Sequence, residues 1–107
     1  MKRAVARPQA RSDRRDQVRY YRNQAGAQVA QRLAGSLRKA ISELELNPGI
    51  GSPTLGKRLG IERLRTLRLG DFPLMLVYIE RLDHLDVVRL LGERQDLADI
   101  IGNDLPD

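Results

Sequence analysis

Arginine and carboxylate side chains are the residues of this sequence best suited to chemistry. Arg65, Arg68 and Arg89 fall in segments predicted as neighbouring strands, so at least two could converge on one sheet face. Converging guanidinium groups stabilise phosphate and would suit an RNA-cleaving site. Such a site also needs one group to take the 2′-hydroxyl proton and another to protonate the leaving oxygen, and no suitably placed histidine or tyrosine is visible. Salt bridges to an acidic partner, or to Glu93 and Asp96 within the chain, are the simpler interpretation.

The histidine and cysteine content excludes most metal and nucleophile chemistry. The sequence has one histidine and no cysteine, which leaves too few ligands for a His- or Cys-based zinc site and no thiolate or disulfide. His84 lies next to Asp83 in a predicted tight turn, where we expect an exposed residue and not a general base. We therefore expect no cofactor and no metal.

The stretch "LLGERQDL" (90–97) places a glycine, two acids and an arginine directly after an apolar run. Acids at the start of a helix interact favourably with the positive end of its dipole, which explains Glu93 and Asp96 without catalysis. Asp96 and Asp99 would share a helix face at a spacing of three. The stretch is predicted to be a strand end followed by a helix start, and not a catalytic centre.

The first half of the chain predicts a short strand and two helices. Residues 3–8 suggest a strand that Pro8 ends, and residues 10 to about 24 suggest a helix. Residues 27–46 form the clearest helix, which "NPG" terminates, and the short break between the helices predicts an antiparallel hairpin. One apolar stripe on this second helix contains Ala30, Leu33, Leu37, Ile41 and Leu44.

The second half predicts a connecting loop and a meander of three strands. Residues 47–60 contain four glycines and two prolines, and lack both the preceding strand of a dinucleotide-binding turn and the Ser/Thr of a phosphate loop. Residues 63–70, 72–80 and 84–92 read as strands joined by short turns. A last short helix is expected around residues 95–101.

The middle strand is apolar on both faces. Phe72, Leu74, Leu76 and Tyr78 should point one way, and Pro73, Met75, Val77 and Ile79 the other. The helical hairpin can cover one face, whereas the last helix alone is expected to be too small for the other. We therefore expect a partner to complete the cover of that face.

The charge of the chain is concentrated at its N-terminus. Residues 1–23 carry eight basic and two acidic side chains, and the remainder carries 11 basic and 12 acidic ones. Four arginines, at positions 11, 15, 19 and 22, form a stripe on the first helix, which is either an ordinary solvated face or a binding face. With one Phe, three Tyr and no Trp, a platform for stacking single-stranded bases is not expected, and an acidic protein explains the charge as well as a nucleic acid does.

The length of 107 residues predicts one domain spanning residues 1–107. The basic N-terminus has no apolar core of a secretory signal, and no apolar run approaches the roughly 20 residues of a membrane span. We therefore expect a cytoplasmic protein.

The order of the elements and four local motifs resemble the ParE/RelE toxin superfamily of type II toxin–antitoxin systems, over about residues 3–101. The motifs are "ARSDRRDQVRYY" with Ala10, Asp13 and Tyr20, "AISELELNPGIG", "LRTLRLGDFPLMLVYIE" with Tyr78, and "VVRLLGERQDL" with Arg94 and Asp96.

Several positions depart from that superfamily, and the missing C-terminal tyrosine favours its ParE branch. Gly92 stands where many relatives have a histidine, and Arg14 and Gln17 stand at usually apolar positions of the first helix, which should weaken its packing. RelE-type members cut mRNA on the ribosome and are expected to carry a tyrosine near the C-terminus, whereas this chain has none after Tyr78. ParE-type members are known as poisons of DNA gyrase and not as nucleases.

The resemblance implies an α+β fold, with an N-terminal strand, an α-helical hairpin packed on an antiparallel β-sheet of about four strands, and a short C-terminal helix. It implies a plasmid-stabilising type of toxin that inhibits DNA gyrase by binding, with no catalytic residue, and that a ParD-like antitoxin neutralises. The antitoxin's C-terminal segment would cover the open sheet face, and no sequence-specific nucleic-acid binding is expected. The partner-binding residues would be Arg65, Arg68, Met75, Arg89 and Arg94.

Two alternatives remain open at this point. The chain could be a RelE-like ribosome-dependent mRNA endonuclease that uses its arginines for charge stabilisation. It could also be a member that still binds an antitoxin and has lost its toxicity, since Gly92 replaces a common family histidine.

Overall fold

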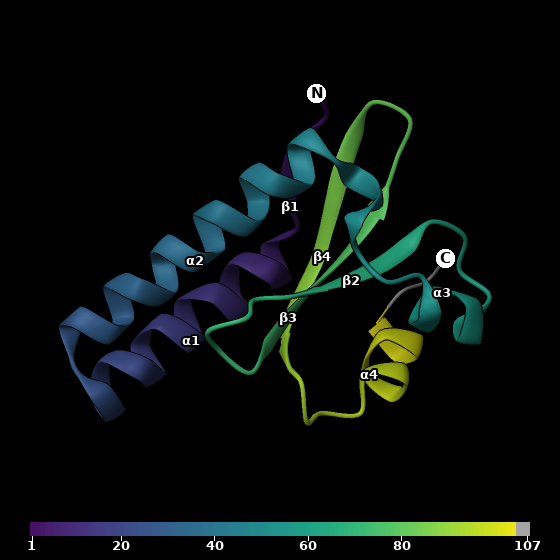
Figure 1. Cartoon of the computed structure of the whole chain (residues 1–107). Coiled ribbons are helices and arrows are strands. Elements are labelled where there is room, and N and C mark those ends of the chain that lie inside the picture. The colour runs from purple at the N-terminus through teal and green to yellow at the C-terminus, as the bar shows by residue number, and fades with distance from the viewer. Residues whose placement is uncertain (105–107) are drawn as a thin grey trace.

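A helical hairpin, a four-stranded sheet and two short helices make up the computed structural model, which describes residues 1–104 (Figure 1). The α+β architecture and the two long helices agree with the prediction from sequence. In chain order the elements are β1 (Arg3–Ala6), α1 (Pro8–Ala25), α2 (Ala27–Leu46), the 3₁₀ turn η1 (Pro48–Ile50), α3 (Thr54–Leu59), β2 (Leu64–Arg68), β3 (Leu74–Glu80), β4 (His84–Gly92) and α4 (Leu97–Asp104).

The sheet has the strand order β1-β4-β3-β2. The predicted meander of β2, β3 and β4 is confirmed, because both of its pairings are antiparallel. β1 instead pairs with β4 in parallel, with Ala4 opposite Leu85, so the sheet is mixed and not wholly antiparallel as expected. The hairpin α1–α2 lies between β1 and the meander in the chain, which gives β1 room to join the sheet in parallel.

The hairpin turn depends on one glycine. Pro8 stands in the first turn of α1, where its missing N–H costs nothing. Gly26 separates the two helices with a φ of 97°, a backbone conformation that glycine adopts without strain. The stripe predicted on α2 faces the sheet, and Leu33, Leu37 and Leu44 are buried there.

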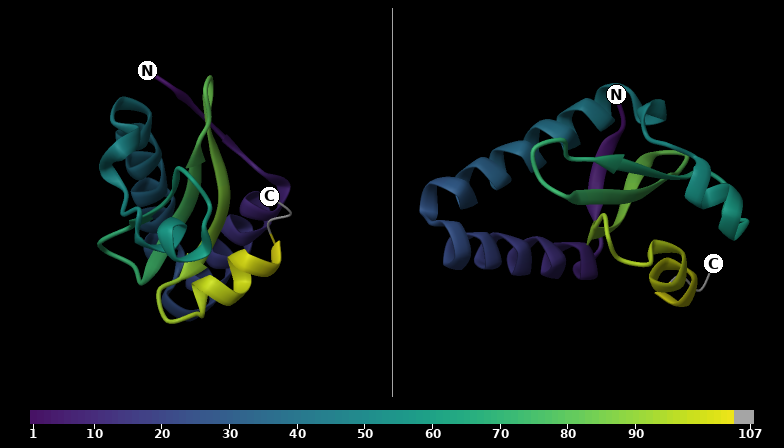
Figure 2. Two further views of the ribbon diagram at one scale, coloured as in Figure 1. Left: turned by 90° about the vertical axis from the view of Figure 1, so that its right-hand side faces the viewer. Right: turned by 60° about the horizontal axis from the view of Figure 1, so that its bottom comes forward.

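The sheet separates two apolar cores, one on each face. In the right-hand view of Figure 2 the α1–α2 hairpin lies to the left, and α3 and α4 lie to the right. The predicted facing of β3 is confirmed: Leu74, Leu76 and Tyr78 pack under α1 and α2, whereas Val77 and Ile79 lie in the core on the other face. Burying apolar side chains on both faces is what a strand without polar alternation requires.

The expectation of an open second face is wrong. Residues 54–59, expected to be part of a connecting loop, form α3, and Leu55 of α3 and Ile101 of α4 bury the face together. Val77 and Ile79 are 0% and 3% exposed as a result. Gly56 permits this packing, because a Cβ there would lie 2.5 Å from the backbone oxygen of Leu64. The apolar character of β3 therefore no longer calls for a partner on this face.

A buried carboxylate on β4 binds the β1–α1 junction and the β3–β4 turn. Asp86 is 8% exposed and accepts hydrogen bonds from Arg7 Nε and Nη2 at 2.9 and 2.8 Å, and from Arg81 Nε and Nη2 at 3.2 and 2.9 Å. Burial raises the pKa of Asp86, but the hydrogen bonds and charges of the two arginines outweigh it, so the pKa lies below its ordinary value.

Because the pKa of Asp86 is depressed in the folded protein, its ionised form stabilises the fold above the ordinary carboxyl pKa of about 3.9, and this contribution is lost as the pH falls through the folded pKa. We expect Asp86→Asn to lower the free energy of unfolding at pH 7 by about 2–4 kcal/mol, because two guanidinium groups lose their carboxylate. The difference from wild type should shrink below about pH 4. Urea unfolding at pH 7, 4 and 3 measures it, and a difference that is constant across this range would contradict the role of Asp86.

Candidate functional site

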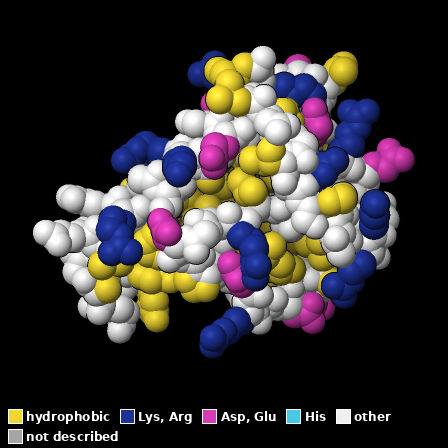
Figure 3. Space-filling model, in the orientation of Figure 1, with side chains coloured by type: hydrophobic (Ala, Val, Ile, Leu, Met, Phe, Trp, Pro, Cys, Tyr) yellow, Lys and Arg dark blue, Asp and Glu magenta, His cyan; other side chains and the backbone are white. Residues whose placement is uncertain are grey.

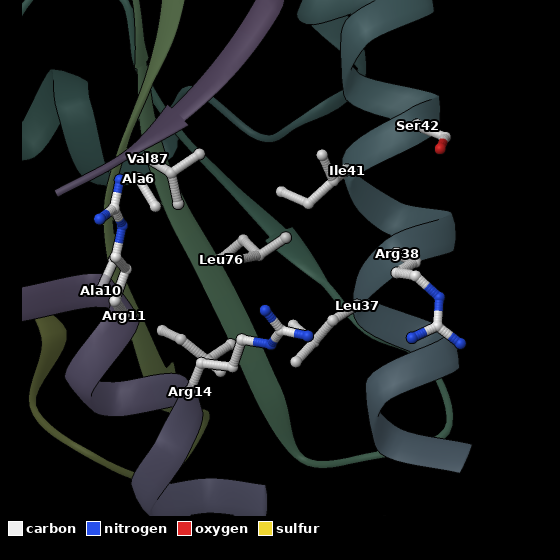
Figure 4. A pocket seen from close by; sticks show the side chains of 11 residues that line it. Ala6, Ala10, Arg11, Arg14, Leu37, Arg38, Ile41, Ser42, Leu76 and Val87 are labelled. Carbon is white, nitrogen blue, oxygen red and sulfur yellow. The ribbon is translucent and has the colours of Figure 1, made fainter. Parts of the chain in front are cut away.

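A groove of about 470 Å³ lies between the helical hairpin and the sheet (Figure 4). Apolar side chains from α1, α2, β3 and β4 point into it, and its lining is mainly apolar. The apolar lining residues are Ala6, Ala10, Leu37, Ile41, Leu76, Val87 and Leu90. Hydrophobic side chains are also visible across the middle of the face shown in Figure 3, with Lys and Arg side chains around them.

Three arginines stand at the rim of this groove. Arg11 and Arg14 come from α1 and Arg38 from α2, and all three side chains are exposed. In Figure 4 the guanidinium group of Arg14 extends from α1 towards Leu37 of α2. Within residues 1–104, no acidic side chain forms a salt bridge with any of the three. The groove therefore combines an apolar floor with a positive rim.

This groove was not predicted from the sequence. Leu37 and Ile41 were expected on the apolar stripe of α2, and Arg14 was an unusual polar residue on α1. Arg14 lines the groove, so an arginine at a usually apolar position of the first helix was the one sign of it in the sequence.

The three strand arginines do not meet in one site. Arg65 Nη1 donates to the backbone oxygen of Gly51 at 2.8 Å, on the face that carries Tyr78. Arg68 lies on the other face of β2, and its Nη2 donates to Glu93 at 3.0 Å. This is the internal pairing with Glu93 that the sequence suggested. Arg89 of β4 is separate from both, and it pairs with Asp13 of α1.

Asp13 of α1 holds Arg89 in a nearly buried ion pair. Its two carboxylate oxygens accept from Arg89 Nε and Nη2 at 2.8 and 3.0 Å, and it also accepts from the backbone N–H of Leu90 at 3.0 Å. The side chains of Arg89 and Asp13 are only 14% and 11% exposed. Ala10, one turn earlier, is buried against the sheet. The Ala–Asp motif of α1 therefore docks this helix on the part of β4 beyond its pairing with β1.

A second, more polar cleft of about 500 Å³ lies on the opposite side of the sheet, beside α3 and α4. Met75 is half-buried in it, next to Arg68 and Glu93. Arg94 is exposed in the turn between β4 and α4. For Arg65, Arg68, Met75, Arg89 and Arg94, the partner-binding role stays a prediction. The other polar lining residues of the cleft are Ser52, Thr54, Arg58, Thr66, Gln95 and Asp96.

The segment after β4 is a strand end and a helix start, as predicted. The backbone N–H of Asp99 donates to Asp96 Oδ1 at 3.1 Å, so the Asp96 carboxylate satisfies one of the free N–H groups at the start of α4. The N–H of Gly92 donates to Gln95 Oε1 at 2.6 Å, which closes the turn. Asp96 therefore has a structural role in this geometry.

Tyr78 of β3 and His84 of β4 make contacts within the fold. Tyr78 is fully buried; its hydroxyl donates to the backbone oxygen of Pro48 at 2.7 Å and accepts from the N–H of Gly51 at 3.0 Å. Burial is the main cause of its raised pKa, which disfavours the phenolate. His84 begins β4 instead of lying in the turn, and its Nδ1 is 2.7 Å from Asp83 Oδ1.

Residues 1–104 contain no cluster of three or more His, Cys, Asp or Glu side chains that could hold a metal ion. None of the helices in this part of the chain is long and apolar enough to span a membrane.

Known proteins share this fold. Among solved structures, the chain is similar to one from the chromosomal ParDE toxin–antitoxin system of P. aeruginosa, with a TM-score of 0.71 and 18% sequence identity. The match covers 86% of this chain and 96% of the other, and at this identity it shows the fold. No curated protein matches the sequence significantly. The family model of the ParE toxin of the type II toxin–antitoxin system parDE matches residues 5–97, and the chain therefore belongs to this toxin family.

Proposed function

We propose that this protein is the toxin of a type II pair in the bacterial cytoplasm, that it inhibits DNA gyrase, and that a ParD-like antitoxin neutralises it by occupying the α1–α2 groove. Membership of the ParE family gives the class of protein. The observation that supports the place of binding is the groove itself, with its apolar floor and its rim of Arg11, Arg14 and Arg38.

The chemistry of the groove defines the segment that would fit it. An amphipathic helix places apolar anchors into such a groove at spacings of three and four residues. The floor contributed by Leu37, Ile41 and Leu76 suits those anchors. Acidic residues beside the anchors would pair with the exposed arginines of the rim, which adds specificity and speeds association.

The same interpretation revises the expected binding surface. The apolar face once expected to need a partner is closed by α3 and α4. The antitoxin is therefore proposed to bind mainly on the side of the sheet that the helical hairpin covers. Arg68, Met75 and Arg94 lie near the opposite cleft, where a continuation of the antitoxin chain would reach them.

The polar cleft favours one alternative function, an mRNA endonuclease of the RelE type. Arg58 and Arg68 would stabilise the phosphate, and Glu93 would take the 2′-hydroxyl proton. Against this, Glu93 already pairs with Arg68 at 3.0 Å, and the Tyr78 hydroxyl is buried and bonded to backbone on the other face of the sheet. Gyrase inhibition is the better supported proposal.

Two assays with the purified protein distinguish these functions, one with gyrase and one with ribosome-bound mRNA. The proposal predicts that the protein abolishes supercoiling of relaxed plasmid by gyrase and leaves the mRNA intact. Cleaved mRNA together with undisturbed supercoiling would favour the endonuclease and reject gyrase as the target.

A further inference from the structure

A second arginine surface lies on α1 and shares Arg11 and Arg14 with the rim of the groove. It forms a shallow hollow between α1 and α2, and five of its seven lining residues are arginines. They are Arg11, Arg14, Arg15, Arg19 and Arg22, and all five are exposed. The remaining lining residues are Val18 and Ala34. We call Arg15, Arg19 and Arg22 the outer arginines, because none of them lines the apolar groove.

The outer arginines keep nearly all of their charge available to a ligand. Within the described part of the chain, their one salt bridge joins Arg19 to Asp16 at 3.6 Å, and both side chains are 66% exposed. A pair of this kind in water contributes about 0–1 kcal/mol and is easily exchanged for a stronger partner. The stripe predicted from the sequence to be either a solvated face or a binding face is thus an exposed arginine surface, in which Asp16 pairs with Arg19.

The spacing of the stripe suits a regular polyanion. Arg11 and Arg22 are 11 residues apart, which corresponds to about 16 Å of helix at 1.5 Å per residue. A DNA duplex carries one phosphate charge per about 1.7 Å, so a segment of this length presents roughly ten phosphates. Five of the seven lining residues are charged, whereas the core of a protein–protein interface is depleted of charged residues.

From this placement we propose that the outer arginines of α1 bind the phosphate backbone of double-stranded DNA without sequence preference. B-DNA has a major groove about 12 Å wide, which admits an exposed helix with phosphates on both sides. The major groove of A-form RNA is too narrow for this approach. Single-stranded DNA would require aromatic side chains for stacking, and the hollow contains none.

Fluorescence anisotropy with a labelled 20-base-pair DNA duplex tests the proposal on the whole protein. We expect a dissociation constant in the micromolar range at moderate salt. Its logarithm should vary with the logarithm of the salt concentration with a slope of about three, since each phosphate contact contributes about 0.9. The variant Arg15→Gln/Arg19→Gln/Arg22→Gln should bind at least tenfold more weakly and lose most of this salt dependence.

A matched control separates this surface from net charge. Arg3→Gln/Lys39→Gln/Lys57→Gln removes the same three charges from exposed positions outside α1 and should bind DNA like wild type. Both variants should keep the wild-type circular dichroism spectrum. If the control loses as much affinity as the outer-arginine variant, or if wild type does not bind, the proposal is wrong.

Two further probes distinguish other polyanions. A 20-base-pair RNA duplex should bind more weakly than DNA, and equal or tighter binding of RNA would overturn the assignment to DNA. A poly-glutamate peptide of equal charge should displace DNA poorly. If it displaces DNA efficiently at the outer arginines, the surface recognises acidic protein instead. None of these assays contains gyrase, so their outcome is independent of the gyrase assay.

Discussion

Ile41→Glu should weaken the binding of the ParD-like antitoxin at least 100-fold. Ile41 is half-buried and points into the groove from α2. A glutamate there puts a carboxylate among the apolar floor residues, where an apolar anchor of the antitoxin would otherwise pack, and it repels acidic residues of the same segment. A 100-fold loss corresponds to about 2.7 kcal/mol, a normal value for an interface hot spot. Isothermal titration of the toxin with its cognate antitoxin measures it.

The control for this experiment is Gln31→Glu, which adds the same charge to α2 at an exposed position outside the groove lining. It should leave the affinity unchanged. Arg14→Ala tests the rim without altering the floor, and should weaken binding several-fold with a smaller salt dependence. Wild-type affinity in both Ile41→Glu and Arg14→Ala would place the antitoxin elsewhere, for example in the polar cleft beside α3 and α4.

Asp13→Ala should lower the free energy of unfolding by about 3–5 kcal/mol, the usual cost of removing one partner from a buried ion pair. Two groups would lose their acceptor, the Arg89 guanidinium and the backbone N–H of Leu90. Arg89 is only 14% exposed, so water replaces the carboxylate poorly. Chemical denaturation followed by circular dichroism gives the value.

The comparison for Asp13 is Asp16→Ala on the same helix. Asp16 forms an exposed pair with Arg19, so its removal should change stability by less than about 1 kcal/mol. The double variant Asp13→Ala/Arg89→Met should recover part of the loss, since the buried charge that has lost the Asp13 carboxylate is removed as well. If Asp13→Ala and Asp16→Ala have equal effects, Asp13 does not dock α1 on the sheet.

Long periodic segments were predictable from sequence, and the short helix was not. α2 matches its predicted range because its apolar stripe repeats over 20 residues and "NPG" marks its end. α3 has six residues, too few for a periodic signal, and lies among glycines and prolines that usually indicate a loop. This one omission produced the wrong expectation of an open sheet face.

The contacts of the candidate site depend on tertiary structure that no local pattern specifies. Asp13 and Arg89 are 76 positions apart, and their pairing follows from α1 lying beside β4 after β1 ends. The family resemblance supplied Asp13 as part of a motif, but the structure supplies its physical reason. The apolar groove likewise depends on how α1 and α2 diverge over the sheet, which cannot be read from the stripe of either helix.

DNA cleavage by purified gyrase tests the proposed gyrase inhibition most directly. Relaxed plasmid, gyrase and ATP are titrated with the protein, and the linear DNA released after denaturation is measured beside the supercoiled product. We expect supercoiling to be lost and linear DNA to appear only when both proteins are present. Prior addition of the antitoxin should prevent both effects. Full supercoiling and no linear DNA, with an excess of folded protein that binds its antitoxin, would contradict gyrase as the target.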